Sequence, residues 1–297
     1  MKKPKKIEEV KKREELSVLI PVYDCMCTDL VSSLHSMLEE SGIRYEIIVA
    51  DDCSPDKEYI ELNRPIEELS NVRYIVREKN SGRAAIRNFL ASEAQYKWLL
   101  FIDGDVMVDR VRFITKYLER GGDVLIGGIS IYKRDRATKN NLRFLYEMHT
   151  MKHRRAWWNV GGKHVKFRTT NFLIAKHIVE EHPFNEAFKR YGYEDVLFGK
   201  KLEEAGIQIR YTNNPVVITD FEDNAKFMEK TEEALQTLHD FKKELRGFSA
   251  IPMFTIFKPV LLPAYYIFGK LIRKNLVSNK PKVALYQLYR VLYYCHL

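Results

Sequence analysis

The chain has 297 residues, of which 45% are hydrophobic and 30% are charged. This length and composition suffice for one substantial hydrophobic core and exclude a chain that is mostly disordered. The formal net charge is +9; seven of the first thirteen residues are Lys or Arg, and no Asp or Glu follows Leu245. A basic excess suits nucleic acid, anionic lipid or a phosphorylated substrate, and charge alone does not choose among these partners.

The cysteine pattern favours a reducing compartment. The four cysteines, Cys25, Cys27, Cys53 and Cys295, lack the spacing of a zinc site or of a disulfide framework. Free thiols are typical of proteins in the cytosol. The basic N-terminus is not followed by the apolar segment of a secretory signal. We therefore expect a cytoplasmic protein.

Short apolar runs alternate with helix-like stretches through most of the chain, behind a basic arm at residues 1–15. The runs that predict buried strands are residues 17–20, 46–50, 72–76, 98–102 and 123–126. The stretches with the length and apolar spacing of helices are residues 28–41, 56–69, 82–94 and 110–120. This alternation predicts an α/β fold with a mostly parallel sheet flanked by helices, over residues 16–224.

Acidic residues follow several of the predicted strands. Asp51 and Asp52 follow the second strand, and Asp103-Gly104-Asp105 follows the fourth. The carboxyl ends of parallel strands form the ligand-binding edge of such a sheet. Each motif alone has a simpler interpretation: Asp52 or Ser54 could cap the next helix, and the Asp-Gly-Asp triplet could be a turn.

The coincidence of these motifs on one edge favours a cation site. Clustered carboxylates repel one another unless a cation is present. Two carboxylates where a strand ends, with a glycine between them, suit Mn²⁺ or Mg²⁺, which complete their shells with waters and substrate phosphates. The sequence therefore predicts that Asp103 and Asp105 hold a divalent cation.

Five motifs in order resemble the inverting family 2 glycosyltransferases, and the resemblance covers residues 16–224. These motifs are Pro21-Val22-Tyr23, Asp51-Asp52-Cys53-Ser54, Asn80-x-Gly82-x-Ala84-x-x-Arg87-Asn88, Asp103-Gly104-Asp105 and Tyr193-Glu194-Asp195. The resemblance implies the GT-A fold, a Rossmann-like sheet flanked by helices. It also implies sugar transfer from a nucleotide-sugar donor with the help of a divalent cation.

The resemblance assigns roles to individual residues. Pro21, Tyr23 and Asp52 would line the pocket for the nucleobase and ribose. Asp103 would contact the ribose and Asp105 would bind the metal. The basic residues of the third motif, Arg83 and Arg87, are candidate contacts for the phosphates or the base. The alternative for Arg87 is a structural partnership with a nearby carboxylate.

The catalytic base comes from the last motif. Inverting transfer needs a carboxylate on the acceptor side to take the proton of the attacking hydroxyl. The family pattern places this base at Asp195, with Glu194 as an acceptor or support residue. The alternative is that both acids only cap the helix that follows and favour its dipole.

One position departs from the family pattern. Many relatives carry a His, as a further metal or phosphate contact, at the position that aligns with Ile218. Asp220 is the nearest candidate substitute. The departure implies that the cation rests on Asp105 and the diphosphate with little other help from the protein.

Acceptor specificity is expected between residues 130 and 172. Trp157 and Trp158 could stack on sugar faces or pack under a loop. The segment 168–174 is expected to return the chain to the sheet, and its Asn171 to line the acceptor side.

The final region, residues 225–297, is predicted to be helical, basic and aromatic. The uncharged stretch between Lys258 and Lys270 is too short to span a bilayer and contains two prolines. Tyrosines that alternate with Lys and Arg suit an element lying on an anionic membrane surface. The alternative is a packed helical subdomain or an oligomer interface.

Together these features predict an inverting glycosyltransferase at the inner face of the cell membrane, with Mn²⁺ or Mg²⁺ as cofactor. It would move a sugar from a nucleotide-diphosphate donor, UDP favoured by the resemblance, to a hydroxyl of a glycan or lipid-linked acceptor in surface polysaccharide or glycolipid synthesis. The alternatives are a nucleotidyltransferase, although its Gly-rich loop is absent after the first strand, and a non-catalytic basic membrane- or nucleic-acid-binding protein. No nucleic-acid module is recognisable, so nucleic acid is not expected as a partner.

Overall fold

The computed structural model describes residues 12–131, 138–158 and 167–297, and for residues 151–158 it describes only the backbone. Most of the predicted basic arm therefore lies outside the described residues, as do the side chains of Trp157 and Trp158. The indole contacts expected of these two residues stay a prediction.

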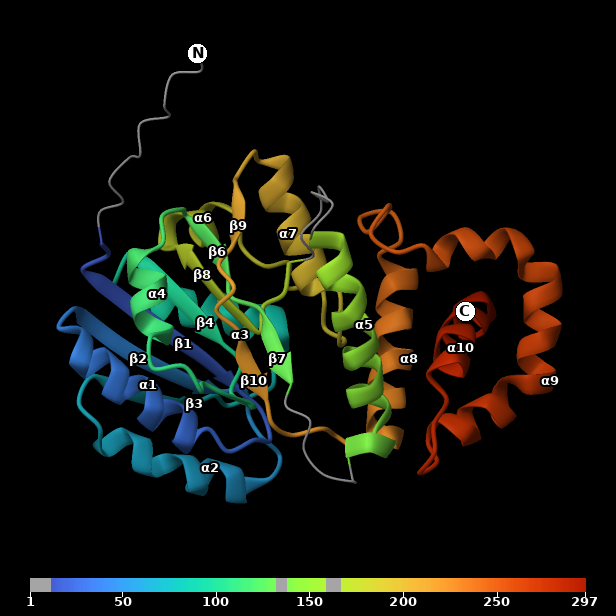
Figure 1. The fold of residues 1–297 in the computed structure, drawn as a ribbon, viewed down its shortest axis with the longest axis horizontal. Helices are drawn as coiled ribbons and strands as arrows, with labels where there is room; N and C mark the ends of the chain where they lie inside the picture. Colours follow the sequence, from blue (N-terminus) through green and yellow to red (C-terminus); the bar gives the residue numbers. More distant parts are fainter. Residues whose placement is uncertain (1–11, 132–137, 159–166) are drawn as a thin grey trace, which may run out of the picture.

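A seven-stranded sheet forms the centre of the part of the molecule that precedes α8 (Asn224–Asp240), with the order β3-β2-β1-β4-β8-β6-β9 (Figure 1). The strands are β1 (Glu15–Val22), β2 (Arg44–Asp51), β3 (Val72–Val76), β4 (Trp98–Ile102), β6 (Val124–Ile126), β8 (Asn171–Ala175) and β9 (Ile209–Tyr211). The five strands predicted from the apolar runs are all present. Strand β8 runs antiparallel to its neighbours β4 and β6, whereas the other pairs are parallel. The predicted α/β fold is confirmed.

A small second sheet lies at the carboxyl end of β4. It consists of β5 (Val106–Met107), β10 (Val216–Ile218) and β7 (Ile129–Ile131), in the order β5-β10-β7. Ile218 pairs with Val106, the residue directly after the Asp-Gly-Asp triplet. The position where many relatives carry a His is therefore next to the predicted cation site.

Helices cover both faces of the main sheet (Figure 1). They are α1 (Thr28–Ser41), α2 (Lys57–Asn63), α3 (Arg83–Glu93), α4 (Phe113–Glu119), α6 (Lys176–Glu181) and α7 (Glu194–Glu204), with the short 3₁₀ turn η1 (Arg64–Glu68). Helix α5 (Leu142–Trp158), which follows the 3₁₀ turn η2 (Thr138–Asn140), lies beside the sheet and next to α8 (Figure 1). Successive side chains of a strand point to opposite faces. Val18 and Ile20 therefore pack with α1 and α4, while Leu19 packs on the other face with α3 and α6.

The folded domain includes part of the predicted N-terminal arm. Arg13 is buried, and its guanidinium donates a 2.7 Å hydrogen bond to the carbonyl oxygen of Tyr117. It also lies 4.0 Å from the centre of the Trp98 ring. This basic residue therefore anchors the chain just before β1 instead of belonging to a solvated arm.

The C-terminal region is helical, as predicted. It consists of α8 (Asn224–Asp240), η3 (Ile251–Phe257), α9 (Lys258–Leu276) and α10 (Val283–His296). These helices lie beyond α5 on one side of the sheet, with α9 outermost (Figure 1). Buried residues such as Leu142 of α5, Met228 of α8, Leu276 of α9 and Tyr289 of α10 form one hydrophobic cluster. The C-terminal region therefore packs on the rest of the molecule through the contact between α8 and α5.

The outer face of η3 and α9 is apolar and exposed. Its exposed large side chains are Met253, Phe254, Ile256, Phe257, Val260, Tyr266, Ile267, Phe268 and Leu271. The helical segment Ile251–Leu276 has 26 residues and, by length and composition alone, is sufficient to cross a membrane. The uncharged stretch between Lys258 and Lys270 is part of this longer segment, because the helix continues through Lys258 and both prolines.

Candidate active site

A cavity of about 320 Å³ opens at the carboxyl end of β4. It brings together five of the predicted site residues: Arg83, Asp103, Asp105, Glu194 and Asp195. They come from α3, from the turn after β4 and from the start of α7. Segments more than 100 residues apart in the sequence therefore meet in one site.

The turn after β4 depends on glycine at position 104. The backbone N–H of Gly104 donates to the carbonyl oxygen of Pro21 at 3.3 Å. A Cβ atom at this position would lie 2.9 Å from Cγ2 of Val22 and 3.2 Å from the Pro21 oxygen. Only glycine lets the ends of β1 and β4 approach so closely. This contact fixes the position of the carboxylates on either side of it.

Asp103 is neutralised by two arginines of α3. Arg87 Nη2 donates to Asp103 Oδ1 at 2.6 Å, and Arg83 Nη2 lies 3.4 Å from Oδ2. The same two arginines reach Glu194, at 3.0 Å from Arg83 Nε and 3.9 Å from Arg87 Nη1. This network of ion pairs ties α3, β4 and α7 together and gives Glu194 a supporting position.

Arg87 has the structural role that the sequence left open as an alternative. Its side chain is 1% exposed, and it does not line the cavity. The expectation that Arg87 contacts the nucleotide is therefore corrected, because its guanidinium is buried against carboxylates. Arg83 lies one turn earlier in α3, lines the cavity and remains open to a ligand.

Asp105 differs from Asp103 in its surroundings. Within the described part of the chain, no other side chain donates a hydrogen bond to its carboxylate or forms an ion pair with it. Its pKa is raised, first by the surrounding protein and then by the negative charge of Asp103. The chain thus leaves one carboxylate in the cavity without a partner and next to a second acid.

Asp195 lies in the first turn of α7 and lines the same cavity. Its Oδ1 accepts a hydrogen bond from the Val196 N–H at 2.7 Å. Enclosure by protein, followed by the charge of Glu194, raises its pKa to about 7. The N-cap residue is Tyr193, which has a left-handed φ of 68° and makes no side-chain cap. Neither acid occupies the N-cap position, so simple helix capping does not account for Asp195.

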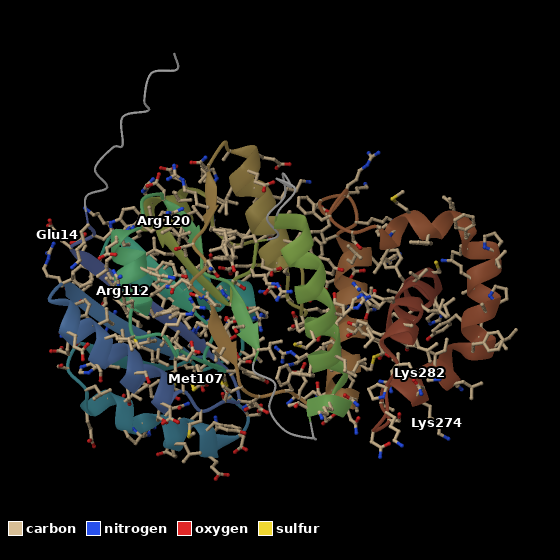
Figure 2. All side chains as sticks on the ribbon, in the orientation of Figure 1. Glu14, Met107, Arg112, Arg120, Lys274 and Lys282 are labelled. Carbon is tan, nitrogen blue, oxygen red and sulfur yellow. The ribbon has the colours of Figure 1, made fainter. Side chains whose placement is uncertain are left out.

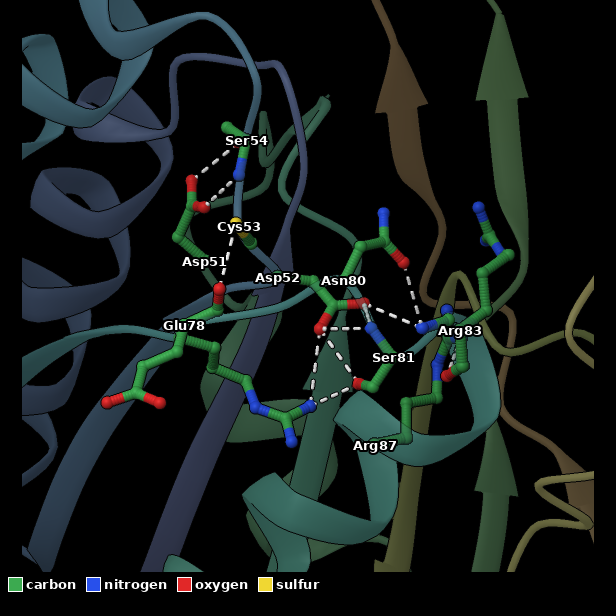
Figure 3. Close-up of polar contacts among 11 residues, drawn as sticks. Asp51, Asp52, Cys53, Ser54, Glu78, Asn80, Ser81, Arg83 and Arg87 are labelled. Atoms are coloured by element: carbon green, nitrogen blue, oxygen red, sulfur yellow. Dashed lines mark hydrogen bonds and ion pairs between the residues drawn. The ribbon is translucent and has the colours of Figure 1, made fainter.

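The Asp-Asp-x-Ser motif holds two loops in place, as Figure 3 shows. Asp51 accepts hydrogen bonds from the N–H and hydroxyl of Ser54. Asp52 points the other way and accepts from the N–H groups of Ser81 and Gly82, the latter at 2.8 Å. Asp52 thus fixes the loop before α3, whereas Asp56 caps α2. The N-cap of α2 is therefore neither Asp52 nor Ser54, the two residues that the sequence suggested for this role.

Three of the residues predicted to bind the nucleoside, Pro21, Tyr23 and Asp52, lie outside the cavity, whereas Asp103 lines it. Pro21 and Asp52 are largely covered at the ends of β1 and β2, while Tyr23 is 49% exposed. Asp24, directly after Tyr23, has a left-handed φ of 47°. These residues share the strand edge with Asp103, so contact with a nucleoside stays a prediction.

The structure corrects the role expected for Asn171. The side chain is 1% exposed and makes hydrogen bonds within the core. Its Nδ2 donates to the carbonyl oxygen of Asn214 at 2.7 Å, and its Oδ1 accepts from the Tyr117 hydroxyl at 2.7 Å. Asn171 therefore joins β8 to neighbouring segments. The preceding residues Arg168, Thr169 and Thr170 do line the cavity.

The sequence did not predict the other end of the cavity. It is lined by Arg143 of α5, Lys230 and Thr231 of α8, and Tyr286 and Arg290 of α10. The acid-free C-terminal stretch indicated a basic surface, but no motif indicated that α10 returns to the site. Ile218 lines the cavity with an apolar side chain, while Asp220 is exposed and does not line it. Asp220 therefore does not replace the expected His.

Comparison with known families decides the assignment. A family model described as Glycosyl transferase family 2 matches residues 17–197. The chain belongs to this family.

Curated relatives of this glycosyltransferase are similar over part of their length. One is the putative teichuronic acid biosynthesis glycosyltransferase TuaG of Bacillus subtilis, 34% identical over 92 residues, which are 30% of this chain and 35% of that protein. Another is the poly(ribitol-phosphate) beta-glucosyltransferase of Bacillus spizizenii, 32% identical over 120 residues, 38% of this chain and 19% of that protein. The matches thus span about a third or less of these relatives.

Solved structures share the fold of this glycosyltransferase. S. aureus TarS in complex with UDP-GlcNAc has a TM-score of 0.52 at 18% identity, covering 89% of this chain and 82% of that one. The mannosyltransferase PcManGT of Pyrobaculum calidifontis, in complex with GDP-Man and Mn²⁺, has a TM-score of 0.55 at 12% identity, covering 94% and 84%. The GT-A fold is confirmed, and family membership favours sugar transfer over the alternatives of nucleotidyl transfer and non-catalytic binding.

Proposed function

We propose that this glycosyltransferase moves a sugar from a nucleotide-diphosphate donor to an acceptor hydroxyl, with inversion at the sugar carbon and a UDP-sugar as the favoured donor. The observation that carries the proposal is the placement of Asp105 and Asp195 in one cavity, neither with an ion-pair partner among the described residues. The two carboxylates come from β4 and α7, on the donor and acceptor sides that the family pattern implies. The complexes of similar structures with UDP-GlcNAc and GDP-Man support a nucleotide-sugar donor.

The residues present fit a divalent cation that is shared with the donor. Asp105 offers hard oxygen ligands without a competing partner, and its raised pKa is what a bound cation would reverse. Among the described residues, no group of three or more His, Cys, Asp or Glu side chains could hold a metal ion alone. Asp105 would therefore hold the ion together with the diphosphate of the donor. When bound, the cation neutralises the charge of the leaving diphosphate.

Arg83 and Asp195 have the other two roles in the proposed reaction. Arg83, which forms ion pairs with Asp103 and Glu194, would contact the diphosphate. Asp195 takes the proton from the acceptor hydroxyl as its oxygen bonds to the sugar carbon. The bond from that carbon to the phosphate oxygen breaks, and the electron pair leaves with the diphosphate. A carboxylate with a pKa of about 7 suits a general base near neutral pH.

We place this activity in the synthesis of a cell-surface polysaccharide. Relatives are named for teichuronic acid, succinoglycan and poly(ribitol-phosphate). The acceptor would be a hydroxyl of a glycan or of a lipid-linked chain.

We also propose that the outer face of η3 and α9 docks on an anionic membrane. Nine large apolar side chains are exposed there, and no acidic residue follows Leu245. Figure 2 shows Lys274 and Lys282 at the same end of this region. Gly269, Ile272 and Leu276 of α9 are buried, so the helix keeps one face on the protein and the other free. An apolar face beside basic side chains is typical of interfacial helices.

A thermal-shift screen tests the donor and the cation together. Nucleotide diphosphates with Mn²⁺ should raise the melting temperature, because a ligand of the native state stabilises it. Mn²⁺ alone should not, since Asp105 lacks partner ligands. In Asp105→Asn we expect the Mn²⁺-dependent part of the shift to vanish and turnover to fall about 100-fold or more.

The control is Asp109→Asn, an exposed acid outside the cavity, which should behave like the wild type. Cation-dependent turnover that survives in Asp105→Asn would contradict the metal assignment.

A further inference from the structure

Three cations that the transfer reaction does not use line the cavity. They are Arg290 of α10, Lys230 of α8 and Arg143 of α5. We propose that they form a subsite for a phosphate group carried by the acceptor. The inference rests on the proposed function, because it assumes that this cavity receives the acceptor.

Arg290 is the central observation. It lines the cavity, is partly buried and has no ion pair within the described ranges. Its Nη1 donates to the side-chain oxygen of Gln287 at 3.0 Å, and its guanidinium lies 5.6 Å from the centre of the Tyr286 ring. Its positive charge acts on the pKa of Tyr193, two residues before Asp195. A cation surrounded by neutral groups favours an anionic ligand, because burial without a counter-charge is costly.

The two other cations share one carboxylate. Arg143 Nη1 lies 3.2 Å from Glu222 Oε2, and Lys230 Nζ lies 2.5 Å from the same oxygen. Arg143 and Lys230 together carry one more positive charge than Glu222 neutralises, and Arg290 adds a further positive charge. Of the nearby acids of α8, Glu232 pairs with Arg273, and Glu233 keeps its negative charge while it accepts a hydrogen bond from the Tyr191 N–H. Neither of these two acids lines the cavity, whereas Lys230 and Arg290 do.

The subsite lies beside the donor end. The ring of Tyr191 is flanked by Arg83, 5.4 Å from its centre, and by Lys230, at 5.7 Å. An acceptor held at Lys230 and Arg290 would thus lie close to the Arg83 network and to Asp195. Arginine presents a planar fork that matches phosphate oxygens, and lysine adds a point charge. This chemistry favours a phosphate ester over a neutral sugar.

The phosphate could belong to a polyol-phosphate unit or to the diphosphate of a lipid-linked acceptor. Both present the same oxygens to the subsite. Soluble probes of each kind separate them: ribitol 5-phosphate and glycerol 3-phosphate for the first, and a short prenyl diphosphate in detergent for the second. Ribitol and glycerol serve as neutral controls.

The experiment measures melting temperature and probe affinity with UDP and Mn²⁺ at saturation, so that the donor end is filled. We expect a phosphate probe to stabilise the wild-type protein and its neutral counterpart not to. In Arg290→Gln the probe should bind about 10- to 100-fold more weakly, the effect of losing hydrogen bonds to a charged group. The shift caused by UDP should be unchanged. Arg290→Lys should retain part of the affinity.

The matched control is Arg246→Gln, which removes an exposed arginine from the same region but outside the cavity. If Arg290→Gln fails to fold, Lys230→Gln tests the same subsite and should also weaken the probe. Stabilisation by UDP without any effect of phosphate probes would overturn the subsite alone. Equal probe affinity in Arg290→Gln and wild type would overturn it too. Lack of stabilisation by every nucleotide would instead contradict the proposed function.

Discussion

Three acids with similar side chains have different surroundings in this site. Asp103 is paired with Arg83 and Arg87, whereas Asp105 and Asp195 face the cavity without ion pairs among the described residues. The pKa of Asp105 is raised and that of Asp195 is raised to about 7. Groups whose surroundings oppose their charged form are common at functional sites. The sequence named all three residues, but only their neighbours distinguish a paired acid from a free one.

Asp195→Asn should abolish transfer and leave nucleotide binding intact. Removing a general base typically lowers the rate about 10²- to 10⁴-fold. In the wild type, kcat/KM should rise with pH through about 7, because the base must be ionised. The control is Asp223→Asn, at the start of α8, which should keep full activity. Loss of both binding and folding in Asp195→Asn would support a structural role.

The same variant should have a characteristic effect on stability. The folded protein holds the Asp195 proton more tightly than the unfolded chain, since its pKa rises from 3.8 to about 7. Through this group, the free energy of unfolding therefore falls as pH rises between these values. The Asp195→Asn variant has no carboxyl group at this position, so its free energy of unfolding does not fall with pH for this reason. Its stability relative to wild type should increase from pH 5 to pH 8, measured by chemical denaturation.

At the scale of elements, the contact between the ends of β1 and β4 positions the donor side. The two strands are parallel neighbours, and Gly104 lies against Pro21 and Val22 where both end. On the other side of the site, Arg83 and Arg87 connect α3 to β4 and α7. The site is therefore rigid where three elements converge, and small displacements there should affect binding.

Gly104→Ala should fold but bind nucleotide poorly. Its Cβ would meet Val22 Cγ2 at 2.9 Å, so the turn that carries Asp103 and Asp105 must move. Overpacking of this kind costs about 1–3 kcal/mol of stability. Gly42→Ala is the control: its left-handed φ of 66° makes alanine unfavourable by about 1–2 kcal/mol, with no atom within 4 Å. Equal nucleotide affinity in both variants would contradict this role of Gly104.

At the scale of the whole molecule, the C-terminal region has two faces with different surroundings. Its inner helices α8 and α10 line the cavity and pack on α5 and α7. Its outer helix α9 is exposed on the opposite side (Figure 1). The inner face agrees with the packed subdomain, one of the two alternatives from the sequence, and docking of the outer face on a membrane stays a prediction. A membrane on the outer face would keep the cavity close to a lipid-linked acceptor.

Ile267→Glu combined with Leu271→Glu should weaken binding to vesicles that contain phosphatidylglycerol by about 10-fold or more. Both side chains are 65% exposed, and burying one such side chain contributes about 1.5–3 kcal/mol. Vesicle flotation measures the effect, and added salt should weaken the wild-type interaction. Val111→Glu, at an 86% exposed position outside this region, is the control. A wild-type dimer that does not bind vesicles and becomes a monomer in the double variant would identify a protein interface instead.

Much of the fold followed from local patterns. Four of the five apolar runs are strands buried on both faces, and such burial requires a continuous run of apolar residues. The fifth, β3, lies at the edge of the sheet and is only partly buried. The short β5, β7, β9 and β10 have two or three residues each and leave little periodicity to detect. The antiparallel direction of β8 depends on its neighbours β4 and β6, which the sequence of 168–174 does not specify.

The sequence by itself determined the family, the ordered acids at the strand ends and the base candidate Asp195, because these depend on residue type and position along the chain. Only the tertiary structure decided which side chains are free. It buried Arg87 and Asn171, left Asp105 without a side-chain partner among the described residues and brought Arg143, Lys230 and Arg290 to one cavity. The physical reason is that burial and charge pairing arise between segments far apart in the sequence, and local patterns do not record which segments meet.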